Sequence, residues 1–125
     1  MKNQEENEPQ LYFPDDLISE YTAFKERVYS PKSVLYPSCD FEASSIKVFD
    51  NVTFVDINSK PIELMKKAGF KAYAQNIKDY KPAEAHDLLI LLNPAIPTEW
   101  ASRHLLSGAW IISNNYHGNA SEMHS

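Results

Sequence analysis

The chain has 125 residues, a hydrophobic fraction of 43% and a formal net charge of −5, which suits one domain with a buried core. Its basic residues are scattered, so the composition does not favour binding a long nucleic acid through its phosphates. The longest apolar run, Leu88–Leu92, is too short to span a membrane, and the polar N-terminus lacks the pattern of a signal peptide. With a single cysteine, Cys39, we expect a cytoplasmic protein without an internal disulfide.

The N-terminal part predicts a tail followed by a helix. Residues 1–10 are polar and acidic and predict a disordered tail, which leaves 11–125 as a single domain. Pro14 and the two acids after it begin a helix, because proline is tolerated in the first turn and acids favour the helix dipole. Pro31 disfavours helical geometry before it, so the helix should end near residues 29–30. Its packing face has apolar side chains at helical spacing, namely Leu17, Tyr21, Phe24 and Val28.

The remainder alternates short apolar strands with helices. The predicted strands are Ser33–Tyr36, Val52–Asp56, Lys71–Ala74, Asp87–Leu92 and Ala109–Ser113. The predicted helices are a short one near Ser44–Phe49, one over Ser59–Ala68 and one over Thr98–Leu106. Ser59 is the expected N-cap of the second, and Gly69 its left-handed end. This alternation predicts a doubly wound α/β fold, a mainly parallel sheet of about five strands with helices on both faces, truncated after strand five.

In such a sheet, ligands bind beyond the carboxyl ends of the strands. The loop after the first strand, Tyr36–Ser45, contains no glycine and carries two acids, which argues against the pyrophosphate of a dinucleotide. Asp56 ends the second strand, where its carboxylate could accept both hydroxyls of an adenosine ribose. Asn76 and Ile77 follow the third strand, and an amide beside an apolar side chain suits an adenine.

The order of these segments resembles class I S-adenosylmethionine-dependent methyltransferases. The resemblance covers residues 33–113 and is carried by Val34–Cys39, Val55–Asn58, Asn76–Ile77 and Asp87–Pro94. It implies a Rossmann-like fold and a small-molecule ligand, S-adenosylmethionine or S-adenosylhomocysteine, with an unknown methyl acceptor.

The resemblance also implies roles for individual residues. The first loop would cradle the methionine part, Asp56 would hold the ribose, and Asn93 would be the candidate for orienting an acceptor. The implied cofactor-binding residues are Pro37, Ser38, Cys39, Asp40, Asp56, Ile57, Asn76, Ile77, Asn93 and Pro94.

Other interpretations stay open. The missing loop glycines favour a catalytically inactive module that acts in protein interaction or regulation, and an enzyme with another adenosine ligand is a third alternative. An unpaired edge at the fifth strand would need covering, for example by a second copy in a homo-oligomer. Cys39 is either an activated thiol or a packing residue. Asp40 and Glu42 either meet an amino group or are solvated, and Asp56 could instead cap the next helix. The four histidines lack metal-ligand spacing, so no metal site is predicted.

Overall fold

The computed structural model describes residues 9–81, 85–92, 105–113 and 120–122. These residues form one six-stranded sheet in the order β3-β2-β1-β4-β5-β6. The first five strands are parallel, and β6 is antiparallel to β5. Strand order reverses between β1 and β4, so the doubly wound topology is confirmed. The strands are β1 Val34–Pro37, β2 Val52–Asp56, β3 Lys71–Ala74, β4 His86–Leu91, β5 Leu105–Ser113 and β6 Ala120–Glu122.

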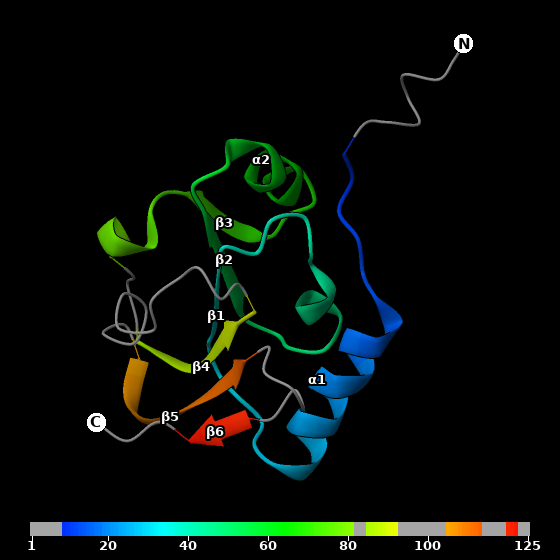
Figure 1. The fold of residues 1–125 in the computed structure, drawn as a ribbon, viewed down its shortest axis with the longest axis vertical. Coiled ribbons are helices and arrows are strands. Elements are labelled where there is room, and N and C mark those ends of the chain that lie inside the picture. The colour runs from blue at the N-terminus through cyan, green and yellow to red at the C-terminus, as the bar shows by residue number, and fades with distance from the viewer. Residues whose placement is uncertain (1–8, 82–84, 93–104, 114–119, 123–125) are drawn as a thin grey trace.

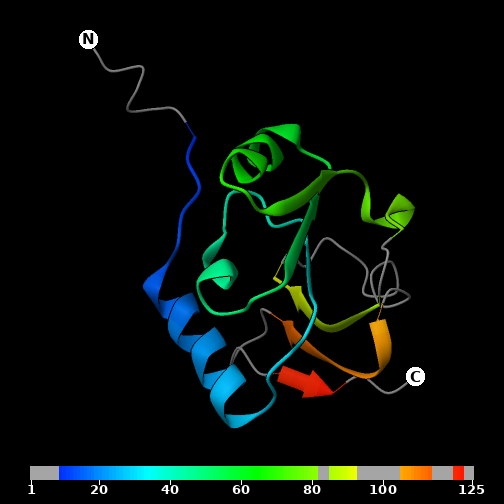
Figure 2. The same ribbon diagram turned by 180° about the vertical axis from the view of Figure 1, so that it is seen from behind.

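The described helices are distributed unequally over the two faces of the sheet. They are α1 Asp15–Arg27, the 3₁₀ turn η2 Ser44–Lys47, α2 Ser59–Lys67 and the 3₁₀ turn η3 Ile77–Asp79. Figures 1 and 2 show α1 and η2 on one side and η3 on the other. Buried side chains of α1 and α2 join one core cluster with alternate strand residues, for example Tyr21, Met65 and Phe54. The opposite cluster contains Leu35, Val55 and Leu89, together with Ile77 and Tyr80.

Two local predictions about the helices are corrected by the structure, and a third is confirmed. Val28 lies beyond the end of α1 and is 48% exposed, because the packing face of that helix ends at Phe24. The N-cap of α2 is Asn58, whose side chain accepts a hydrogen bond from the Lys60 amide, and Ser59 is the first helical residue. Gly69 has the predicted left-handed conformation, with φ of 88°.

The C-terminal part differs most from the sequence expectation. Residues 98–104 of the predicted helix lie outside the described residues, but Leu105 and Leu106 belong to β5, where Leu105 pairs with His86 of β4. Gly108, two residues beyond the predicted end of that helix, lies inside the strand with φ of 84°. The pairing between His86 and Leu88 contains a register shift, so β5 has an irregular rather than a helical start.

The sheet does not stop at strand five. β6 pairs with Trp110–Ile112 of β5, so the edge expected to be unpaired is covered there by the chain itself. A second copy of the chain is therefore not needed to cover β5 at these residues, and this reason for expecting a homo-oligomer is removed there. Of the predicted tail, only Pro9 and Gln10 are described. Within the ranges given above, no helix has the length and apolar character needed to cross a bilayer.

Candidate functional site

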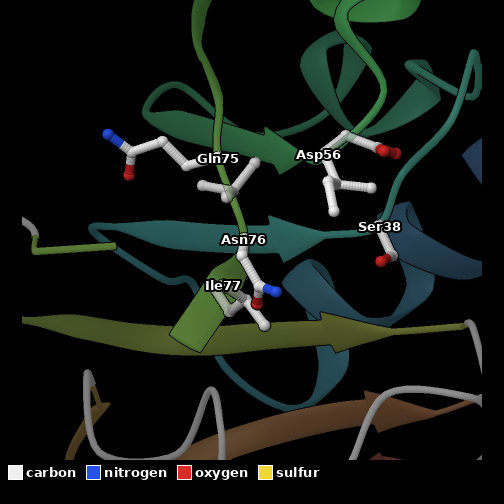
Figure 3. A pocket seen from close by; sticks show the side chains of 7 residues that line it. Ser38, Asp56, Gln75, Asn76 and Ile77 are labelled. Atoms are coloured by element: carbon white, nitrogen blue, oxygen red, sulfur yellow. The ribbon is translucent and has the colours of Figure 1, made fainter. Parts of the chain in front are cut away.

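The carboxyl ends of β1, β2 and β3 meet at one edge of the sheet, where they line a hollow of about 110 Å³. Figure 3 shows Asp56 and Ser38 at the ends of neighbouring strands, with Asn76 and Ile77 from the segment after β3. The lining residues are Ser38, Val55, Asp56, Ile57, Gln75, Asn76 and Ile77. The structure thus brings together five of the predicted cofactor-binding residues.

The first loop adopts glycine-like conformations without glycine. Ser38 and Asp40 have φ of 53° and 54°, in the left-handed region. The Ser38 amide donates to the Val55 carbonyl at 2.7 Å, which joins the loop to the end of β2. An aspartate tolerates this conformation better than most residues, because its short polar side chain bonds locally. The missing glycines therefore did not prevent a tight turn beyond β1.

Asp56 connects this loop to the turn before α2. Its carboxylate oxygen Oδ2 accepts from the Asp40 amide at 2.7 Å, and Oδ1 accepts from the Asn58 amide at 2.8 Å. The residue is only 7% exposed. Each carboxylate oxygen can accept a second hydrogen bond, so two acceptor positions remain for a ligand.

The other side of the hollow is formed by residues after β2 and β3. Ile57 is 73% exposed, which leaves an apolar side chain available beside Asp56. Asn76 caps η3, since its Oδ1 accepts from the Lys78 amide at 2.9 Å. Ile77 packs into the second core cluster with Leu35 while still lining the hollow.

Gln75 was not predicted from the sequence. It lines the hollow, and its amide donates to the Asp56 carbonyl at 3.0 Å. Its side-chain amide extends away from the Asp56 carboxylate in Figure 3. Only the end of β3 places it there, since nothing in its local sequence distinguishes it from an ordinary loop residue.

A second, larger hollow of about 370 Å³ lies on the other side of Ser38, which lines both. It is lined by Tyr12, Leu17, Tyr36, Ser38, Cys39, Asp40, Glu42 and Leu92. The sequence did not indicate Tyr12. Its amide donates to the Phe41 carbonyl and its carbonyl accepts from the Ala43 amide, both at 2.9 Å, so the segment before α1 lies against the first loop.

Glu42 forms a buried part of this second hollow. It is 4% exposed, so the alternative of a solvated acid is wrong for Glu42, whereas Asp40 is exposed. Glu42 accepts from the Tyr21 hydroxyl at 3.3 Å and from the Ser44 amide at 2.6 Å, and the Ser44 hydroxyl also donates to it. Burial, and after it the neighbouring Glu42 charge, raises the pKa of Tyr21 well above its ordinary value.

Cys39 fits the packing interpretation. It is 2% exposed, and burial, followed by the nearby charge of Asp56, raises the pKa of its thiol. The thiol therefore stays protonated at neutral pH, and the structure does not support an activated nucleophile.

Two predicted site residues, Asn93 and Pro94, lie outside the described residues. Among the residues that the structure does describe, no group of histidine, cysteine and acidic side chains is arranged to hold a metal ion. His86, the described histidine, is buried, with Nδ1 2.8 Å from the Ser33 hydroxyl.

No family model matches the sequence, and no curated protein does either. Solved structures do match. The N-methyltransferase NodS from Bradyrhizobium japonicum is 13% identical with a TM-score of 0.63, over 79% of this chain and 66% of NodS. CalS10, an amino pentose methyltransferase from Micromonospora echinaspora involved in calicheamicin biosynthesis, is 14% identical with a TM-score of 0.61, over 86% of this chain and 58% of CalS10.

A third match is the sugar N-methyltransferase KedS8 from Streptoalloteichus, at 13% identity and a TM-score of 0.60, over 93% of this chain and 59% of KedS8. The chain has the fold of these methyltransferases. At such low sequence identities the match shows a shared architecture and nothing more. The chain covers between 58% and 66% of the length of these three proteins. NodS was also solved with S-adenosylhomocysteine, and CalS10 with S-adenosylmethionine bound.

Proposed function

We propose that this chain binds S-adenosylmethionine or S-adenosylhomocysteine at the carboxyl edge of its sheet and serves as a methyltransferase domain. The observation that carries the proposal is the convergence of Asp56, Ile57 and Ser38 on a hollow at the end of β2. Solved proteins that share this fold hold the same ligands. The smaller hollow would take the adenosine, and the larger one, beyond Ser38, would take the tail.

Asp56 would have two tasks in this arrangement. Its bonds to the Asp40 and Asn58 amides hold the loop and the turn in place. Its free acceptor positions would then accept the ribose hydroxyls in charge-assisted hydrogen bonds, which are stronger than neutral ones. The exposed Ile57 would cover one face of the adenine, and the amide of Asn76 would meet its edge.

Bound S-adenosylmethionine supplies an electrophilic methyl carbon. The contribution of the protein to methyl transfer would be mostly to hold the acceptor in line with that carbon and to exclude water. Asn93, which follows the fourth strand in the sequence, stays our candidate for orienting the acceptor.

One observation favours a second function, that of a regulatory or interaction module without catalysis. The Asp56 carboxylate is buried and accepts hydrogen bonds from two backbone amides. These contacts are sufficient to explain the residue by a structural role without a ligand. A domain of this kind could retain the loop geometry after losing its ligand.

Calorimetric titration and thermal shift with both ligands and with adenosine separate these functions. We expect saturable binding. Ile57→Ala should weaken it by about 1 kcal/mol, because the largely exposed isoleucine side chain would be buried against the adenine and the alanine would lose that contact. Val28→Ala, another exposed aliphatic residue, is the matched control and should bind as the unchanged chain does. Absence of both heat and thermal shift at millimolar ligand would reject the methyltransferase proposal in favour of the second function.

A further inference from the structure

The larger hollow has an acidic and aromatic lining. Asp40 lies exposed at its edge and Glu42 is buried within it, while Tyr12 and Tyr36 contribute aromatic rings. None of the described residues that line it is basic.

The charge of Glu42 is solvated by neutral groups in the described structure. Its donors among the described residues are the hydroxyls of Tyr21 and Ser44 and the Ser44 amide. Such donors stabilise a carboxylate without cancelling its charge. The nearby basic side chains are engaged elsewhere, since Lys25 Nζ donates to the Val48 carbonyl at 2.9 Å and Lys47 Nζ lies 4.8 Å from the centre of the Phe13 ring.

The field in this hollow therefore favours cations and disfavours anions. Burial raises the pKa of Tyr12, and the charges of Asp40 and Glu42, next in effect, raise it further, as neighbouring carboxylates do. The low local dielectric around a buried carboxylate strengthens both effects. Tyrosine rings beside the acids provide a further surface that attracts cations.

We propose that, among adenosine ligands, the larger hollow prefers one whose tail is cationic and carries no carboxylate, as in decarboxylated S-adenosylmethionine, over S-adenosylmethionine itself. This inference rests on the proposed function, because an adenosine held in the smaller hollow is what brings the tail past Ser38. The decarboxylated compound places a sulfonium and an ammonium near Asp40 and Glu42. S-adenosylmethionine adds a carboxylate, which would lie among like charges.

The test is calorimetric titration of the full chain with three compounds: decarboxylated S-adenosylmethionine, S-adenosylmethionine and methylthioadenosine, whose tail is neutral. We expect the decarboxylated compound to bind at least about tenfold more tightly than S-adenosylmethionine, the scale of one charge-assisted contact. Because Asp40 is exposed, the preference should decrease as salt is added.

The variant Asp40→Asn assigns the preference to this hollow. It removes the charge and keeps both the backbone amide and a residue type that tolerates the left-handed conformation. We expect the ratio of the two affinities to fall at least about threefold, which is the scale of one solvent-exposed charge pair, while the affinity for methylthioadenosine stays unchanged. Glu63→Gln, an exposed acid on α2, is the matched control and should leave the ratio unchanged.

The outcomes distinguish the two proposals. Saturable binding of methylthioadenosine without a preference for the decarboxylated compound would overturn the selectivity and leave the proposed function standing. A preference that Asp40→Asn does not reduce, in a variant with an unchanged unfolding midpoint, would also overturn it. Failure of all three compounds to bind would instead remove the proposed function.

Discussion

Two aspartates at opposite ends of the sheet are buried to nearly the same extent but have different surroundings. Asp87, near the amino end of β4, is 6% exposed, and Asp56, at the carboxyl end of β2, is 7% exposed. Asp87 accepts from the Lys32 amide at 3.0 Å, the Ser33 amide at 2.8 Å and the Tyr29 hydroxyl at 2.7 Å. Asp56 accepts from two backbone amides and lines a hollow.

The difference shows that burial alone does not separate a carboxylate that lines a hollow from one that is enclosed by hydrogen-bond donors. The amino end carries a polar network that includes His86, whose ring nitrogens lie 2.8 Å from the Ser33 hydroxyl and 3.2 Å from the Tyr80 hydroxyl. The carboxyl end carries a loop with two left-handed residues that are not glycine. Such backbone strain is common at binding sites, where the surrounding structure holds it in place.

The largest expected effect is a loss of stability at alkaline pH. Burial raises the pKa of Cys39, Tyr21 and Tyr36 near the carboxyl end above the ordinary values of 9.0 and 10.0, and the hydrogen bond to Asp87 raises that of Tyr29. The folded chain keeps these protons where the unfolded chain releases them. Stability is therefore complete below these ordinary values and decreases as pH rises, by about 1.4 kcal/mol per pH unit for each fully buried group.

Denaturant unfolding at a series of pH values from neutral to strongly alkaline would measure this loss. Cys39→Ala should remove the first part of it, just above the ordinary pKa of a thiol, while Tyr29→Phe should leave that part unchanged. A free energy of unfolding that stays constant through the ordinary pKa of tyrosine would show that these side chains are not buried as described.

The next effect compares the two aspartates directly. Asp87→Ala should cost about 3 kcal/mol of stability, because it leaves two backbone amides and a hydroxyl without their acceptor. Asp56→Ala should cost less, about 1.5 kcal/mol, because it frees two amides near a solvent-accessible hollow. Urea unfolding of both variants tests the order. A larger loss for Asp56→Ala would mean that the carboxyl end, and not the amino end, contains the more important structural aspartate.

The smallest effect concerns the left-handed loop. Ser38→Gly should raise stability by about 0.5 kcal/mol, since relief of the backbone conformation slightly exceeds the added entropy of the unfolded chain. Gly69→Ala provides the opposite change at φ of 88° and should cost about 1 kcal/mol, although no atom of the described residues beyond its chain neighbours lies within 4 Å of the new methyl group. Thermal unfolding measures both, and a clear destabilisation by Ser38→Gly would show that the serine side chain supports the loop.

Much of the fold was determined by local sequence patterns. The bounds of β2 and β3 match the prediction, and α2 is one residue shorter than expected. These elements are specified by neighbours along the chain: β-branched and aromatic residues in β2, basic residues in the last turn of α2 and Gly69 after it. The position of Asp56 at the carboxyl edge of the sheet could be predicted because the end of a parallel strand is determined by the strand itself.

Other features depended on contacts between distant residues. The start of β5 has an apolar pattern compatible with a helix, and pairing with β4 decided that it is a strand. The burial of Glu42 required Tyr21 of α1 and the Tyr12 segment to pack against the first loop. The bond from the Asp40 amide to Asp56 joins residues 16 positions apart, which no local pattern encodes. Local propensity specifies an element, but only packing and hydrogen bonding between elements decide which polar groups are buried and which face a hollow.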